Sequence, residues 1–510
     1  MSKARAVMIQ GTASSAGKSL LTAGLCRIFA RQGYRVAPFK AQNMALNSFI
    51  TANGLEMGRA QVVQAECAGT PPDIRMNPVL LKPNSERGSQ VIVNGVPIGN
   101  MQAAEYHAYK KNLIPAVRAA YESLGQDYDI IVIEGAGSPA EINLRAHDFV
   151  NMGMAEIADA PVLLVGDIDR GGVFAALYGT FMLLQPNERA RIKGMIINKF
   201  RGDPAILQPG IEMLAQKFAE TGLACPVLGV VPWLPVDIDD EDSLSSRFAR
   251  KEQAVVDIAL IRFPRTSNFT DFIPLEGMDG VSVRWVNCRK ELGEPDFMIL
   301  PGTKSTMDDL RWLRQNGLEA AVLKQVESGT PLLGICGGYQ MLGKRLRDPQ
   351  GAEGGGEIAG MGLLEAETQF VPEKVRRQVR GKTRELPGFF SALGGLRFAG
   401  YEIHTGRTVI AASGSAAVTL QSGEGPEYPD GAVAGNVMGS YVHGLFDSAE
   451  ICTALAQALA AKKGIALKTG RTLDAGAARQ VQYEQLADAL EAALDMRGIE
   501  EILQVPSTRE

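Results

Sequence analysis

The segment "PLLGICGGYQMLG" (residues 331–343) places Cys336 between a run of aliphatic residues and two glycines. A buried structural cysteine does not require such a tight turn. A nucleophile benefits from one, because glycines let the backbone turn sharply and leave the side chain exposed above a sheet. The helix-like stretch that follows would also favour the reactive thiolate. These features predict a nucleophilic Cys336, against the alternative of a small buried apolar residue.

A nucleophilic cysteine needs a base, and the chain contains four histidines. His443 lies in "MGSYVHGLF", at a strand end flanked by glycines, and is the preferred base. His404, in "GYEIHTG", is the second choice, whereas His107 and His147 lie in the first half of the chain. The long separation from Cys336 in the sequence is no obstacle, because such pairs are adjacent in space. The alternative for His443 is a structural histidine.

Acyl transfer through a cysteine also needs two N–H donors for the developing oxyanion. Gly337 directly follows the nucleophile and is one expected donor. The other is Gly302, which ends an apolar strand-like run in the open turn of "ILPGTKST". We therefore expect both glycines to lie beside Cys336.

A second group of residues could bind the phosphates of ATP. The segment "IQGTASSAGKSLLTAGLCRIFARQG" (residues 9–33) continues an apolar run into an amphipathic helix pattern. Gly11, Thr12 and Gly17 belong to a loop whose backbone N–H groups can point at phosphates. Lys18 could bridge the terminal phosphates, and the Ser19 hydroxyl could bind Mg²⁺. The spacing is one residue longer than in the commonest phosphate-binding loop. The alternative is a glycine-rich turn that only begins a helix.

A magnesium site also needs a carboxylate opposite the loop. Glu134 ends the apolar run in "IIVIEGAG" and is the first candidate, because ligands gather at the carboxyl ends of parallel strands. Asp167, at the end of "LLVGD", is the second. Either carboxylate could instead cap a following helix.

The elements that position these residues predict an α/β protein. With 510 residues, the chain exceeds the usual size of one hydrophobic core, so two or more domains are expected. Continuous apolar runs separated by helical stretches indicate a doubly wound parallel sheet in the first part. These runs are residues 6–10, 35–39, 128–135, 161–168, 192–198 and 226–232.

The pattern changes after Pro232, which divides the chain. We predict one domain over 1–235, a polar linker over 236–252, a second strand-rich domain over 253–450 and a helical tail over 451–510. The tail, after Asp447, has the spacing of two helices. Glycine and charge between residues 348 and 400 indicate loops or an insertion.

Composition excludes several classes of function. The net charge is −5 with acidic and basic residues mixed, which gives no basic face for nucleic acid or anionic lipid. No run approaches the roughly 18 apolar residues of a membrane span, and the first apolar stretch is too short for a signal peptide. The six cysteines show neither metal-type pairs nor a disulfide framework. We therefore expect a cytoplasmic protein that acts on small molecules, of unknown oligomeric state.

The first half resembles dethiobiotin synthetase and the related ATP-dependent amidoligases. The matching segments are "GTASSAGKS", "PFKAQN", "EGAG" and "IINKF". The resemblance implies that ATP phosphorylates a carboxylate substrate, with Lys40 beside the transferring phosphate and Asn198 beside the adenine. The alternatives are a lysine extended along apolar surface and a turn-forming asparagine.

Residues of roughly 250–450 resemble the class I (triad) glutamine amidotransferase domain, which implies a flavodoxin-like fold. In that family the cysteine forms a glutamyl thioester and releases ammonia. The usual glutamate two residues after the histidine is absent, since Leu445 stands there. Either another carboxylate orients the ring of His443, with Glu402 and Asp447 as candidates, or a cysteine–histidine pair suffices.

Three segments, "KAQNMALNSFIT" (40–51), "EMGRAQVVQAECAG" (56–69) and "MNPVLLKP" (76–83), resemble the cobyric acid synthase family. The resemblance implies amidation of the b, d, e and g carboxylates of adenosylcobyrinic acid a,c-diamide by ATP, Mg²⁺ and glutamine. The polar side chains of Gln42 and Asn43 would contact the substrate or its phosphate, with a helix-capping loop as the alternative.

Two rival functions remain at this point. One is the a,c-diamide synthase of the same pathway, or another amidoligase–amidotransferase fusion. The other is a non-enzymatic nucleotide switch, similar to the partition ATPases, with a degenerate second domain.

Overall fold

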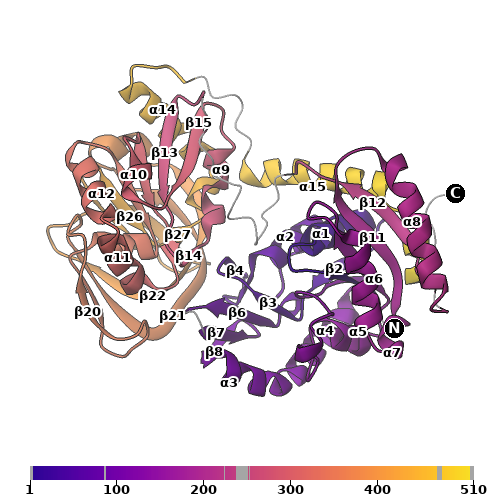
Figure 1. Cartoon of the computed structure of the whole chain (residues 1–510). Helices are drawn as coiled ribbons and strands as arrows, with labels where there is room; N and C mark the ends of the chain where they lie inside the picture. Colours follow the sequence, from indigo (N-terminus) through magenta and orange to yellow (C-terminus); the bar gives the residue numbers. More distant parts are fainter. Residues whose placement is uncertain are drawn as a thin grey trace.

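The computed structural model describes residues 4–84, 88–222, 224–236, 251, 253–467 and 474–505. Figure 1 shows two α/β parts side by side. We call residues 4–236 the front domain and residues 251–467 the rear domain. Most of the predicted linker, 236–252, lies outside the described residues.

The front domain is built on a six-stranded sheet in the order β12-β11-β10-β1-β9-β2, in which all strands are parallel. Each strand coincides with one of the six apolar runs, so that prediction is confirmed. The runs are continuous rather than alternating because helices cover both faces. The strands are β1 (Arg5–Gly11), β2 (Val36–Phe39), β9 (Ile130–Glu134), β10 (Val162–Asp167), β11 (Ile192–Phe200) and β12 (Val227–Pro232).

Two hydrophobic clusters, one on each face, attach the helices to this sheet. α1 (Lys18–Arg31) packs on one face, and α4 (Ile114–Asp127), α5 (Met152–Ala158) and α6 (Val173–Leu183) pack on the other. The doubly wound architecture is therefore confirmed. α7 (Pro186–Arg189) and α8 (Pro204–Ala219) complete this part of the chain.

Between β2 and β9 the chain forms a smaller sheet in the order β3-β6-β7-β8 and a β4–β5 hairpin. These strands lie on the side of the front domain that faces the rear domain (Figure 1). α2 (Arg59–Cys67) follows the hairpin directly. The bounds are β3 (Gln42–Met44), β4 (Ser48–Ile50), β5 (Glu56–Gly58), β6 (Val79–Pro83), β7 (Gly88–Val93), β8 (Val96–Gln102) and α3 (Ala103–Tyr109).

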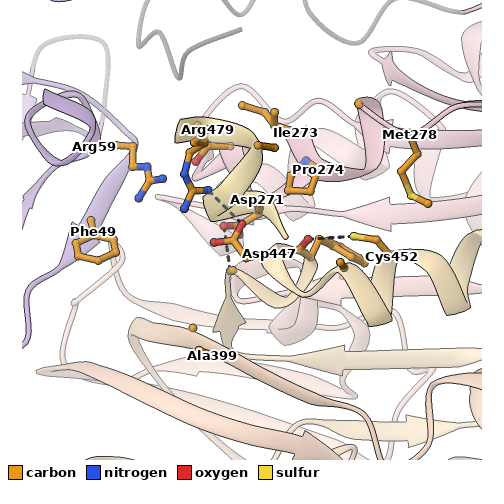
Figure 2. Close-up of a pocket in the computed structure, with 18 of the residues that line it drawn as sticks. Phe49, Arg59, Asp271, Ile273, Pro274, Met278, Ala399, Asp447, Cys452 and Arg479 are labelled. Atoms are coloured by element: carbon orange, nitrogen blue, oxygen red, sulfur yellow. Dashed lines mark hydrogen bonds and ion pairs between the residues drawn. The ribbon is translucent and has the colours of Figure 1, made fainter. Parts of the chain in front are cut away.

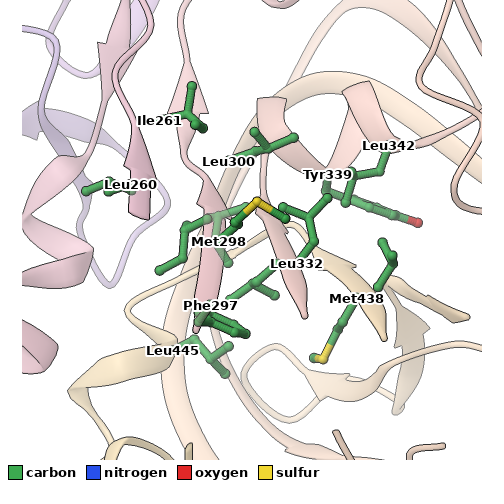
Figure 3. Close-up of a cluster of buried hydrophobic side chains, with 14 of the residues drawn as sticks. Leu260, Ile261, Phe297, Met298, Leu300, Leu332, Tyr339, Leu342, Met438 and Leu445 are labelled. Carbon is green, nitrogen blue, oxygen red and sulfur yellow. The ribbon is translucent and has the colours of Figure 1, made fainter. Parts of the chain in front are cut away.

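The rear domain contains a second six-stranded sheet in the order β15-β13-β16-β18-β26-β25, parallel except for β25. Its core is formed by apolar side chains such as Phe297, Met298 and Leu332 (Figure 3). The strands are β13 (Val256–Ile261), β15 (Val281–Val286), β16 (Phe297–Leu300), β18 (Leu332–Ile335), β25 (Ala432–Ala434) and β26 (Val437–Ser440). The accompanying helices are α9 (Ile273–Glu276), α10 (Arg289–Leu292), α11 (Thr306–Gln315), α12 (Leu318–Glu327) and α13 (Gly337–Leu342).

Of the two alternatives for residues 348–400, loops or an insertion, the expectation of loops is wrong, because this region contributes to a further sheet in the order β20-β19-β21-β22-β27. Its two long strands are β21 (Ala366–Thr383) and β22 (Arg397–Ile410). One stretch of β21 alternates buried and exposed residues, which explains how so many charged side chains fit a strand. The other members are β19 (Arg345–Asp348), β20 (Gly356–Ala359), β23 (Val418–Gln421), β24 (Tyr428–Asp430) and β27 (Val442–His443).

The tail was expected to form two helices, but three are described after Asp447: α14 (Ala449–Lys462), α15 (Ala475–Ala493) and α16 (Met496–Leu503). α14 packs in the core of the rear domain, whereas α15 and α16 return to the front domain and cover the face that carries α1. Leu486 and Leu490 are fully buried there. Within the described ranges, no helix combines the length and the apolar character needed to cross a bilayer.

Candidate active sites

Cys336 lies at the junction of β18 and α13 with φ 52° and ψ −107°. A positive φ is costly for a residue other than glycine, so the surrounding structure must hold this conformation. A Cβ atom on Gly338 would lie 2.0 Å from the Leu300 carbonyl oxygen, which explains why the turn requires glycine there. The sequence prediction of a sharp strand–cysteine–helix turn is therefore confirmed.

The thiol of Cys336 and the imidazole of His443 line the same small pocket. The two glycines predicted as oxyanion donors each adjoin a residue that lines it: Gly302 precedes Thr303, and Gly337 follows Cys336. A Cβ atom on Gly302 would be 3.1 Å from Cε1 of His443, and one on Gly337 would be 3.0 Å from the backbone nitrogen of Thr303. Gly302 and Thr303 form the short strand β17, which pairs with β14 (Thr266–Ser267).

Asp271 is the partner of His443. Its Oδ2 lies 2.6 Å from His443 Nδ1, and its Oδ1 accepts a hydrogen bond from the backbone N–H of Gly444 at 3.2 Å. Asp271 belongs to the short 3-10 helix η4 (Phe269–Phe272), 172 residues before His443 in the sequence. The cysteine, the histidine and a carboxylate thus meet in one place, and the carboxylate comes from an unexpected part of the chain.

The sequence-based candidates Glu402 and Asp447 for this position are wrong. Glu402 accepts hydrogen bonds from Arg377 at 2.5 Å and Tyr428 at 2.6 Å and lies 3.5 Å from His404. Burial would raise the pKa of Glu402, but the contacts with His404, Arg377 and Tyr428 hold it at about 2. Asp447 lies 3.7 Å from Arg479 instead.

The charge state of His443 follows from these neighbours. Burial of the ring disfavours the imidazolium, but the Asp271 carboxylate and the adjacent Cys336 raise the pKa of His443 to about 10. The ring also stacks on Tyr401, with 5.3 Å between centroids. A protonated imidazole held in one orientation next to a thiol stabilises the thiolate.

His404, the second choice as base, lines the same pocket but is held differently. Its Nδ1 lies 2.7 Å from the carbonyl oxygen of Gly406, and its ring stacks on Tyr441 at 3.6 Å. His107 and His147 are exposed in the front domain.

The predicted phosphate loop lies between β1 and α1 in the front domain. Gly17 has φ 95°, and a Cβ atom there would lie 2.1 Å from Nδ2 of Asn198. Lys18 Nζ donates to the carbonyl oxygens of Ala13, at 2.9 Å, and Gly137, at 3.0 Å. These hydrogen bonds fix the ammonium group of Lys18 between the phosphate loop and the segment that follows β9. The other loop residues predicted to contact ATP are Gly11 and Thr12, and Thr12 donates its N–H to Val165 at 2.9 Å.

Asn198, predicted to lie beside the adenine, contacts the loop itself. Its Nδ2 donates to the carbonyl oxygen of Ala16 at 2.9 Å. The next residue, Lys199, donates to the carbonyl oxygen of Ser15 at 2.6 Å and lies 3.0 Å from Asp167 Oδ2. The carboxylate of Asp167, the second metal candidate, thus forms an ion pair with Lys199.

Glu134 is 1% exposed, and its carboxylate accepts hydrogen bonds from two other residues predicted for this site. Its Oε1 accepts from Ser19 Oγ and Lys40 Nζ, each at 2.8 Å. Its Oε2 accepts from Gln64 at 2.6 Å. Burial alone would raise the pKa of Glu134, but Lys40 and the hydrogen bonds from Gln64 and Ser19 hold it below its usual value. The group is therefore an ionised carboxylate next to the Ser19 hydroxyl, a hard-oxygen pair that fits Mg²⁺.

The residues predicted to contact the substrate lie beside this network. Asn43 Nδ2 donates to Gln61 Oε1 at 3.0 Å, and Gln61 in turn lies 3.4 Å from Glu134 Oε2. Gln42 accepts from the hydroxyl of Tyr106 at 2.5 Å. Gln61 and Gln64 lie in the segment 56–69 that was singled out for its resemblance, but neither was predicted individually, because several polar side chains of α2 are equally available.

A larger cavity of about 520 Å³ lies between the front domain, the rear domain and α15. Figure 2 shows Arg59 of the front domain facing Arg479 of α15 across it, with Asp271 nearby. The cavity therefore reaches the carboxylate that holds His443. Apolar side chains such as Ile273 and Met278 form another part of its wall.

Comparisons with known proteins agree with this two-site architecture. Residues 7–246 match the model of the CobQ/CobB/MinD/ParA nucleotide binding domain, and residues 257–451 match that of the CobB/CobQ-like glutamine amidotransferase domain.

Full-length relatives extend the match over almost the whole chain. The cobyric acid synthase of Ruminiclostridium cellulolyticum is 56% identical over 98% of this chain and 97% of its own length. The cobyric acid synthase of Lachnoclostridium phytofermentans is 54% identical over 98% of this chain and 99% of its own length. The cobyric acid synthase of Photorhabdus laumondii is 53% identical over 97% of this chain and 97% of its own length. The chain therefore belongs to the cobyric acid synthase family.

Proposed function

We propose that this protein uses ATP and glutamine to convert the b, d, e and g carboxylates of adenosylcobyrinic acid a,c-diamide to carboxamides. The product is adenosylcobyric acid, and the reaction class is a carbon–nitrogen ligase with glutamine as nitrogen donor. The supporting observation is that one chain contains a cysteine–histidine–aspartate pocket and a phosphate loop with a converging carboxylate. The full-length similarity to cobyric acid synthases gives the substrate.

In the rear domain, the Cys336 thiolate attacks the amide carbon of glutamine. The N–H groups of Gly302 and Gly337 stabilise the oxyanion of the tetrahedral intermediate. The imidazolium of His443, oriented by Asp271, gives its proton to the departing nitrogen, and ammonia leaves. The glutamyl thioester is then hydrolysed by water, with His443 acting as base and glutamate as product.

In the front domain, an oxygen of the substrate carboxylate attacks the γ-phosphorus of ATP, and ADP leaves. Lys18 and Lys40 stabilise the negative charge on the phosphoryl oxygens, and the backbone N–H groups of the Gly11–Gly17 loop hold the phosphates. Ammonia then attacks the acyl phosphate carbon, which releases phosphate and leaves the amide. Ser19 and Glu134 would hold Mg²⁺, which supplies charge neutralisation at the phosphates when bound.

We expect amide nitrogen to pass from glutamine into the corrinoid. Purified protein with ATP, Mg²⁺, glutamine labelled with nitrogen-15 in its amide, and the a,c-diamide should yield a product carrying four labelled amides, as read by mass spectrometry. Conversion of cobyrinic acid into a diamide would instead favour the a,c-diamide synthase. Consumption of ATP without labelled product would contradict the proposal and favour the nucleotide switch.

The carboxylate partner of His443 gives a second prediction. Asp271→Asn should lower kcat/KM for glutamine hydrolysis about 10²- to 10⁴-fold, because the amide neither stabilises the imidazolium nor selects the same tautomer. The pKa of His443 should fall from about 10, so the alkaline limb of the glutaminase pH profile should move to lower pH. Asp447→Asn is the matched control. A larger effect of that control than of Asp271→Asn would contradict this assignment.

The remaining expectations belong to the same proposal. We propose a division into an amidoligase domain (1–235), a linker (236–252), an amidotransferase domain (253–450) and a tail (451–510). We also propose a cytoplasmic location, small-molecule substrates and no nucleic-acid partner, which the mixture of acidic and basic residues along the sequence and its lack of a cysteine framework support.

A further inference from the structure

The pocket that holds Cys336 is lined by an unusual number of charged side chains. Three lysines, Lys82, Lys304 and Lys374, and one carboxylate, Glu353, face it together with the catalytic residues. Lys82 is buried and the other three are partly buried, so an unpaired charge on any of them carries a cost for its removal from water. The mechanism described above uses none of them.

Two of the lysines have a partner within the protein. Lys82 Nζ lies 3.0 Å from Glu56 Oε1 and 2.9 Å from Ser48 Oγ, and Lys374 Nζ lies 2.6 Å from Glu56 Oε2. Glu56 is fully buried, so one carboxylate serves two ammonium groups from different domains. Lys82 of β6, in the front domain, thereby forms part of the wall of the rear-domain pocket, and Glu56 of β5 holds it in place.

Lys304 and Glu353 differ from this pair of lysines. Within the described residues, neither side chain has an ion-pair partner within 4 Å, although both line the pocket. Glu353 Oε2 accepts a hydrogen bond from the backbone N–H of Thr306 at 2.8 Å, and the backbone N–H of Met307 also interacts with this carboxylate. Lys304 lies two residues after Gly302 and close enough to Cys336 for the thiolate to influence it. A cation and a carboxylate are thus presented together beside the nucleophile.

The pKa values of these groups reflect the missing counter-charges. Burial raises the pKa of Glu353 to about 7, against the opposing effect of Lys304. Burial and the neighbouring Lys82 lower the pKa of Lys304, although Glu353 opposes the shift. A ligand with both a carboxylate and an ammonium group would restore the charged form of each side chain.

Glutamine is such a ligand. Its α-carbon is only three bonds from the amide carbon that reacts with Cys336, so its α-carboxylate and α-ammonium must lie on the walls of this pocket. We propose that Lys304 binds the α-carboxylate of glutamine, that Glu353 binds its α-ammonium, and that Lys82 of the front domain closes the site. This inference rests on the proposed use of glutamine as nitrogen donor, and it makes the glutamine site a shared site of both domains.

The two charge contacts can be separated with two partial analogues used as competitive inhibitors of glutamine-driven amidation. Glutaramate lacks the α-ammonium, and 4-aminobutanamide lacks the α-carboxylate. Lys304→Gln should raise KM for glutamine and Ki for glutaramate about 10- to 100-fold, and leave Ki for 4-aminobutanamide nearly unchanged. Glu353→Gln should give the reverse pattern, with the effect on glutamine and 4-aminobutanamide only. Equal effects of either variant on both analogues would overturn the proposal.

The contribution of the front domain is tested with Lys82→Gln and, as a matched control, Lys111→Gln at an exposed position of the same domain. Lys82→Gln should raise KM for glutamine, and Lys82→Arg should restore part of the affinity. Lys324→Gln, exposed on α12, is the control for the rear domain. An unchanged KM for glutamine in Lys82→Gln would exclude its role in this pocket.

Amidation driven by ammonium chloride bypasses the glutamine pocket and reports a folded, active front domain in every variant. Wild-type protein that amidates no corrinoid with ATP and either glutamine or ammonium would refute the proposed function. If the wild-type protein amidates the corrinoid but the Lys304 and Glu353 variants do not affect the two analogues in opposite ways, only the assignment of Lys304 and Glu353 is refuted.

Discussion

Replacing Cys336 with alanine is expected to reduce glutamine-driven amidation about 10⁴-fold or more, while amidation with high ammonium continues. In the proposed mechanism the Cys336 thiolate forms the bond to glutamine, so its removal should cost as much as the loss of the nucleophile. Ammonia added directly reaches the acyl phosphate without a thioester. The measurement is the rate of amide formation with each nitrogen donor, followed by mass spectrometry of the corrinoid.

Cys452→Ala is the matched control for this variant, because Cys452 is also a buried thiol of the rear domain and donates to the carbonyl oxygen of Phe446 at 3.0 Å. It should keep both activities. Unchanged use of glutamine by Cys336→Ala would contradict the nucleophile assignment, and loss of the ammonium-driven reaction would indicate that the substitution damages the whole fold.

The parts of the rear site that could be predicted from the sequence are those with a local signal. Cys336 precedes two glycines and ends an apolar strand, and His443 is flanked by glycines at the end of another strand. Asp271 has no such signal. It lies 172 residues from His443, in "NFTDFIP", where an aspartate is equally expected at the start of a short helix. Only the folded chain places it against the ring.

In the front site, too, only residues with a local sequence signal could be predicted. The phosphate loop with Lys18 and Ser19 joins a strand to a helix, and Glu134 ends another strand, so their proximity could be predicted from the sequence. Gln64 on α2 could not, because several polar side chains on that helix are equally available. The orientation of α2 about its own axis places Gln64 against Glu134, with 2.6 Å between the amide nitrogen and the carboxylate oxygen.

The sheet formed by residues 345–443 was missed for a physical reason. β21 carries many charged residues because part of it alternates buried and exposed positions. Such a strand lacks the continuous apolar run that identifies the parallel strands of the two main sheets. Its glycines also resemble those of loops, although Gly381 lies inside the strand, paired with Phe398.

The β4–β5 hairpin connects the two sites physically. On the rear side, the Ser48 N–H donates to Asn268 Oδ1 at 3.0 Å, three residues before Asp271, and the Tyr401 hydroxyl donates to the carbonyl oxygen of Ser48 at 3.1 Å. On the front side, β5 leads directly into α2, whose Gln64 holds Glu134. The hairpin and α2 thus form a continuous run of contacts from the surroundings of His443 to Glu134.

The second large effect is expected for Lys18→Ala. This substitution should lower ATP-dependent amidation about 10³-fold or more with either nitrogen donor, because Lys18 supplies positive charge to the phosphoryl oxygens in the transition state. In the structure its ammonium group bonds the carbonyl oxygens of Ala13, Ser14 and Gly137, so it is already at the mouth of the loop where the phosphates must bind.

The readout that separates the two sites is glutaminase. Lys18→Ala should retain hydrolysis of glutamine to glutamate, since no atom of Lys18 belongs to the pocket that contains Cys336. Lys217→Ala, at an exposed position of α8, is the control and should keep both reactions. Full amidation by Lys18→Ala would exclude the loop from the chemistry. Loss of glutaminase along with amidation would instead indicate that the substitution damages both sites.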